Sequence, residues 1–128
     1  MQGRLLIAGL LLLLGGCGGR VSDSTIVNIE PVNYKEDTLA FLRTYLNDPT
    51  GIREAAISPP VLKTVGGQTR YAACLRFNAK KSNGEHAGSK DRMAVFISGR
   101  FDRLVETVGD QCKEAVYQPF PELERLSR

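Results

Sequence analysis

The pattern of apolar and polar residues divides the chain into an apolar beginning, a polar stretch and a longer segment of alternating faces. Residues 5–14 are nearly all leucine. This run is too short to span a membrane as a helix, but it has the length of a signal-peptide core. A buried N-terminal helix is the alternative, although the run has no polar face. Residues 17–32 predict a tether, in which a β-like patch at 26–29 is compatible with an edge strand.

Residues 34–46 have the spacing of an amphipathic helix. One side of this helix carries Tyr34, Leu39, Phe41, Leu42, Tyr45 and Leu46. Asn33 and Glu36 have the spacing of a capping box at its beginning, and the Asn-Asp-Pro sequence at 47–49 ends it. We expect the apolar side to pack against a core, and a groove for a partner is the alternative.

Alternation with a period of two residues predicts the strands of a sheet. In the clearest strand, at 70–79, the odd-numbered positions from 71 to 79 should face the helix, and Cys74 should lie on the other face. The strand at 91–98 is apolar on both faces and should be central, and a tight turn at Ser98-Gly99 leads into a last strand at 101–108. Residues 52–58 form a candidate first strand, while 61–69 are expected to be a loop with a turn at 66–67.

These elements predict an α+β fold, in which one amphipathic helix packs on a three- to four-stranded antiparallel sheet. Short helical turns are expected around Cys112 and after Pro121. The chain has 128 residues, which leaves room for one small domain at 33–128 after a signal peptide at 1–16 and a tether at 17–32.

The sequence Leu14-Gly15-Gly16-Cys17 resembles the lipobox of bacterial lipoproteins, in which the cysteine becomes the lipid-bearing first residue of the mature chain. The resemblance implies cleavage before Cys17 and several acyl chains, such as palmitate, on that residue. More than one acyl chain anchors a protein durably. The mature domain would then face the periplasm of the cell envelope. Gly18, where an aspartate would resemble an inner-membrane retention signal, favours the outer membrane.

Two cysteines remain for the mature domain, Cys74 and Cys112. An even number in an oxidising compartment predicts a disulfide, and two buried free thiols are the alternative. We expect the segment around Cys112 to cross the sheet face that carries Cys74.

No catalytic, cofactor-binding or metal-binding pattern is recognisable, so we expect a protein that is not an enzyme and holds neither cofactor nor metal. The single histidine, His86, lies in a polar loop at 80–90, and a zinc site would need three or four ligands. Asp102 and Glu106 share the parity of one strand, but such pairs are common on solvated surfaces.

Charge is unevenly distributed along the chain. Residues 70–103 carry eight cations and three acids, a net charge of +5, whereas the whole chain has +3. The candidate residues for an anionic partner are Arg70, Arg76, Lys80, Lys81, Lys90 and Arg92. Ordinary protection of exposed sheet edges and loops is the favoured interpretation of these charges. A patch for an anionic partner, such as a glycolipid, a phospholipid or an acidic protein face, is the alternative. The aromatic residues of a nucleic-acid platform are missing from the loop, so no nucleic acid is expected.

Several segments resemble small uncharacterised lipoproteins of alphaproteobacteria, of the rhizobial kind. They are 41–53, the Cys-Leu-Arg-Phe-Asn-Ala sequence at 74–79, Lys90-Asp91 before a strand, and 117–123. The resemblance implies no activity and no site residues. The sequence therefore predicts a lipid-anchored envelope protein that acts as a non-enzymatic interaction or assembly module. Binding of an anionic lipid through 70–103 is the alternative.

Overall fold

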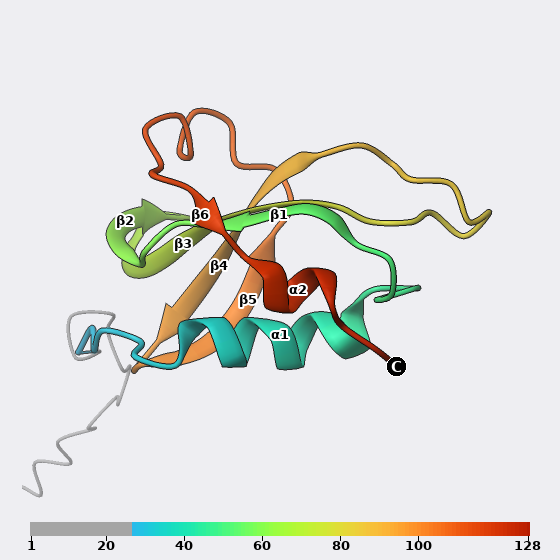
Figure 1. Ribbon diagram of the computed structural model, residues 1–128. Coiled ribbons are helices and arrows are strands. Elements are labelled where there is room, and N and C mark those ends of the chain that lie inside the picture. The colour runs from blue at the N-terminus through green and yellow to red at the C-terminus, as the bar shows by residue number, and fades with distance from the viewer. Residues whose placement is uncertain (1–26) are drawn as a thin grey trace, which may run out of the picture.

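The structure, a computed structural model, describes residues 27–128 (Figure 1). Its helices and strands are α1 (Tyr34–Tyr45), β1 (Arg53–Ile57), β2 (Val61–Val65), β3 (Gln68–Asn78), β4 (Lys90–Ile97), β5 (Arg100–Val105), β6 (Gln118–Pro119) and α2 (Pro121–Glu124). The predicted α+β class is confirmed. The signal peptide and Cys17 lie outside the described residues.

All strand pairs are antiparallel, and β3 is the strand on which the sheet is built. The order is β5-β4-β3-β1-β6, and β2 also pairs with β3. The 11 residues of β3 are long enough to pair with two strands along the same edge. Its first half pairs with β2, from Val65 opposite Gln68 to Val61 opposite Ala72, and its second half pairs with β1.

The expectation of three to four strands is wrong, because the described residues form six. Residues 61–65, which were expected to be loop, are β2. Gly66 and Gly67 have φ values of +59° and +79°, so they form the two-residue turn of a tight hairpin rather than a break in the sheet. The other unexpected strand, β6, has only two residues, and its Pro119 lies at the edge of the sheet, where a missing N–H is tolerated.

The sheet separates two apolar clusters, as the alternation along β3 predicts. On one face, Leu75 and Phe77 are fully buried under α1 and α2, with Leu42 and Phe120. Phe41 of α1 stacks on Phe101 of β5, with 4.5 Å between the ring centroids. On the other face, the segment at 106–117 lies across the sheet, on the side opposite α1 (Figure 1). The cluster there contains Val65, Ala72, Cys74, Met93, Val95 and Cys112.

Asn33 is the N-cap residue of α1, as predicted, but the expected capping box does not form. The Asn33 side chain makes no capping hydrogen bond, because its backbone (φ −104°, ψ 33°) lies outside the extended geometry that capping requires. Residues 27–29 form no strand. At the other end of the chain, Pro121 begins α2 as expected.

Candidate functional site

The disulfide predicted between Cys74 and Cys112 is present and lies in the middle of the face opposite α1. The two Sγ atoms are 2.13 Å apart and the two Cα atoms 5.8 Å apart. Cys74 is fully buried in β3, and Cys112 is 4% exposed. Cys112 belongs to a series of turns at 108–115, in which the backbone N–H of Gln111 donates to Val108 and that of Ala115 donates to Cys112. The disulfide therefore holds an irregular segment against the sheet.

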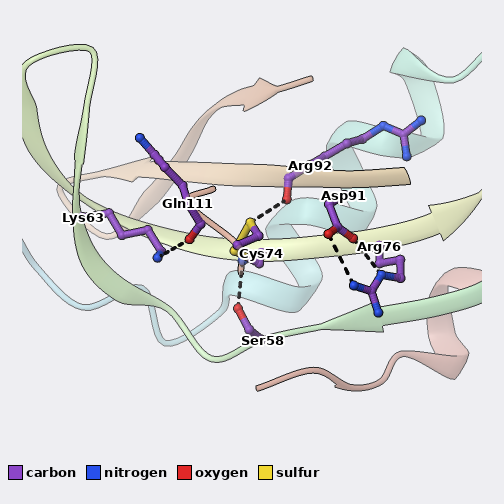
Figure 2. The surroundings of a disulfide bond; sticks show 8 residues. Ser58, Lys63, Cys74, Arg76, Asp91, Arg92 and Gln111 are labelled. Atoms are coloured by element: carbon purple, nitrogen blue, oxygen red, sulfur yellow. Dashed lines mark hydrogen bonds and ion pairs between the residues drawn. A yellow bond between two sulfur atoms is a disulfide. The ribbon is translucent and has the colours of Figure 1, made fainter. Parts of the chain in front are cut away.

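A second attachment joins the same segment to β2. The Lys63 ammonium donates a hydrogen bond of 2.6 Å to the backbone oxygen of Gln111, and the Gln111 amide donates one of 3.1 Å to the backbone oxygen of Thr64. Figure 2 shows Lys63 and Gln111 meeting beside Cys74. These bonds and the disulfide hold the segment at two places, so its position over the sheet is well determined.

A groove of about 310 Å³ lies between this segment and the connection from β1 to β2. Its mostly apolar lining consists of Ser58, Pro59, Val61, Lys63, Cys74, Glu114, Ala115 and Val116. Val61 is 47% exposed and Val116 is 71% exposed, so apolar surface continues to the rim. Ser58 is held in place, because its hydroxyl accepts a 2.8 Å hydrogen bond from the Cys74 N–H and its own N–H donates to the Cys74 oxygen.

The residues of the predicted basic patch that lie on strands are divided between the two faces of the sheet. On the disulfide face, Arg76 forms an ion pair of 2.7 Å with Asp91, and its guanidinium lies 4.1 Å from the centre of the Tyr117 ring. The hydrogen bond from Arg76 lowers the pKa of Asp91. Burial, followed by the Asp91 carboxylate, raises the pKa of Tyr117 to about 12. Figure 2 shows Arg92 leaving β4 on the side opposite Asp91.

On the helix face, Glu106 is the centre of a polar cluster. Its carboxylate lies 2.9 Å from Arg92 and 3.1 Å from Lys90, and it accepts a 2.8 Å hydrogen bond from the Tyr45 hydroxyl of α1. Burial alone raises the pKa of Glu106, but the hydrogen bonds from Tyr45, Lys90 and Arg92 outweigh it and lower the pKa. The Arg92 guanidinium also lies 4.0 Å from the centre of the Phe77 ring. Arg92 and Lys90 therefore join the sheet to the helix.

The other three residues of the predicted patch also have partners. Lys80 lies 4.0 Å from Asp48, and Lys81 lies 4.0 Å from Glu85. Arg70 is only 3% exposed, and its guanidinium donates to the backbone oxygen of Thr69. The structure therefore does not bring the six cations together on one open surface.

His86 links two loops. Its Nε2 lies 2.8 Å from the backbone oxygen of Gly51, which accepts only, so Nε2 carries the proton. Within residues 27–128, side chains of His, Cys, Asp and Glu form no group of three or more that could hold a metal ion.

Sequence reasoning did not find the groove. Its walls come from residues 58–63 and 114–116, which are far apart in the chain, and the disulfide between Cys74 and Cys112 was the only sign that they meet.

Comparison with protein-family models, with curated proteins and with solved structures finds no match for this chain. The part of the chain that the structure describes contains no helix with the length and hydropathy needed to cross a bilayer.

Proposed function

We propose that this protein is a non-enzymatic interaction module of the bacterial cell envelope, anchored through acyl chains on Cys17. Its partner is another envelope protein, which places an apolar segment in the groove beside the disulfide. The groove is the observation that carries this proposal, and the lipobox-like sequence at 14–17 supports the location.

The lining of the groove supports an apolar partner. Val61, Ala115 and Val116 are among its lining residues, and Val116 is 71% exposed. Burial of apolar surface contributes roughly 25 cal/mol per Å² to binding, before the costs of association are subtracted. The walls are already fixed by the disulfide and by the bonds between Lys63 and Gln111. A partner therefore does not need to order them, which lowers the entropic cost of binding.

The alternative, binding of an anionic lipid through residues 70–103, has less support. Arg76, Lys90 and Arg92 each lie within 3.1 Å of a carboxylate, so an anionic lipid would compete with acids of the protein itself. Of the other five cations, Arg70 is buried and Lys80 and Lys81 lie in a loop. Arg100 and Arg103 of β5 lie near Asp37 and Asp102.

Site-specific photocrosslinking in living cells tests the proposal, with the full-length chain and a photoreactive residue at position 61. A reproducible protein adduct is expected there. Val116→Arg should reduce its yield by about tenfold, the change that about 1.4 kcal/mol of binding free energy produces. Ser82→Arg is the matched control, because Ser82 lies in the exposed loop between β3 and β4. An adduct that Val116→Arg leaves unchanged, or an enriched anionic lipid without a protein adduct, would contradict the proposal.

A further inference from the structure

The first described residues form a short segment that packs across one end of the sheet. The Asn28 amide donates a 3.1 Å hydrogen bond to the backbone oxygen of Thr69, next to the β2–β3 turn. The Ile29 side chain lies over Gly99 in the β4–β5 turn, since a Cβ at Gly99 would be 3.4 Å from the Ile29 Cγ2. Pro31 is fully buried. Residues 27–32 therefore have a fixed position on the domain.

This segment nevertheless exposes apolar side chains. Val27 is 71% exposed, Ile29 54% and Val32 84%. They are three of the seven large hydrophobic residues that are exposed in residues 27–128, and they occur within six positions. Such a concentration on a segment whose backbone is held in place indicates contact with an apolar environment.

The covalent distance to Cys17 identifies that environment. Val27 follows Cys17 by ten residues, which reach at most about 35 Å when fully extended. An acylated Cys17 would therefore hold the segment close to the bilayer surface. Binding at such an effectively high local concentration requires little apolar area.

We propose that Val27, Ile29 and Val32 form a membrane-contact surface that inserts into the headgroup region of the bilayer. This inference rests on the proposed anchoring through Cys17. The end of the sheet with the β2–β3 and β4–β5 turns then faces the bilayer. The β3–β4 loop, which extends from the opposite end in Figure 1, points away from it.

The charges at this end favour an apolar contact over an electrostatic one. Residues 30–37, 66–70 and 100–103 together carry four cations and four acids, so they provide no excess of positive charge. Binding through this surface should therefore change little with salt, in contrast to attraction of a basic patch to anionic lipid.

The test uses the full-length acylated protein reconstituted into phosphatidylcholine vesicles that contain a lipid-attached quencher. A fluorophore is attached to Val32→Cys or, as the control, to Asn83→Cys in the exposed β3–β4 loop. Cys74 and Cys112 are paired, and Cys17 would be acylated, so the introduced thiol is the one that reacts. Vesicle flotation is measured on the same samples.

The label at position 32 should be quenched and blue-shifted, while the label at position 83 should show neither change. Equal signals from the two labels in protein that floats with the vesicles would overturn the membrane-contact surface and leave the anchor intact. Protein that does not float would overturn both the anchor and this inference. Quenching at position 32 that disappears in high salt would contradict the apolar mechanism.

Discussion

Loss of the Cys74–Cys112 disulfide should cost this domain a large part of its stability. The bond closes a loop with a sequence separation of 38 residues. In the chain-entropy model, closing a loop of this length stabilises the native state by about 4 kcal/mol, because it restricts the unfolded chain. Typical single domains have a free energy of unfolding of about 5–15 kcal/mol. For a domain of this size, the loss corresponds to a decrease in Tm of about 20 °C.

Urea unfolding of the wild type with and without a reductant measures this contribution while keeping both sulfur atoms in the protein. The m-value should increase on reduction, because the unfolded chain without the cross-link exposes more surface. The control is the Cys74→Ala/Cys112→Ala double variant, on which the reductant should have no effect. A loss below about 1 kcal/mol in the wild type would refute the argument that the cross-link stabilises the fold mainly through the unfolded state.

Three further predictions concern the two faces of the sheet. Phe77→Ala should lower the free energy of unfolding by about 3–5 kcal/mol in urea titrations, because Phe77 is fully buried under the helices. A loss below about 1 kcal/mol would contradict its place in the core. Glu106→Gln should cost about 0.5–1 kcal/mol at pH 7, since the Glu106 side chain is 37% exposed. Because the folded pKa of Glu106 is lowered from 4.5, this stability should be present above pH 4.5 and lost as the pH falls through the folded pKa. A difference that does not decrease as the pH is lowered below 4.5 would contradict the ion-pair account. In a spectrophotometric titration one tyrosine should ionise near pH 12, and Tyr117→Phe should remove that step. Because the folded pKa of Tyr117 is raised from 10.0, the stability that its neutral form contributes should be present below pH 10 and lost as the pH rises toward 12.

The local patterns predicted the elements that are both long and half-buried. Residues 71–75 alternate between the two apolar clusters, so their pattern placed Cys74 opposite α1 and indicated that the Cys112 segment crosses that face. The helix at 34–45 was likewise predicted to within one residue, because its apolar side repeats with the helical period.

The two strands that were not predicted, β2 and β6, lack the long alternation of apolar and polar residues seen in β3. The five residues of β2 stand between Pro59-Pro60 and Gly66-Gly67, which usually mark loops, and their pairing depends on the length of β3. The two residues of β6 pair with β1 only after the chain has crossed the disulfide face. The partner of β2 is adjacent in the chain, whereas the partner of β6 is distant in the chain.

Charge counting along the chain was also insufficient to describe a surface. Arg76 and Arg92 lie on opposite faces of the sheet, and the acid that pairs with Arg92, Glu106, follows it by 14 residues, directly after β5. The groove could not be predicted for a similar reason, because segments that are far apart in the chain form its walls. Residue types and net charge gave no information about which side chains would meet there.

The most direct test of the account is mass spectrometry of the N-terminal peptide of the protein purified from bacterial membranes. Anchoring through Cys17 predicts a chain that begins at Cys17 and carries several acyl chains on that residue. A chain that still begins at Met1, or a Cys17 without acyl chains, would contradict the proposed envelope lipoprotein.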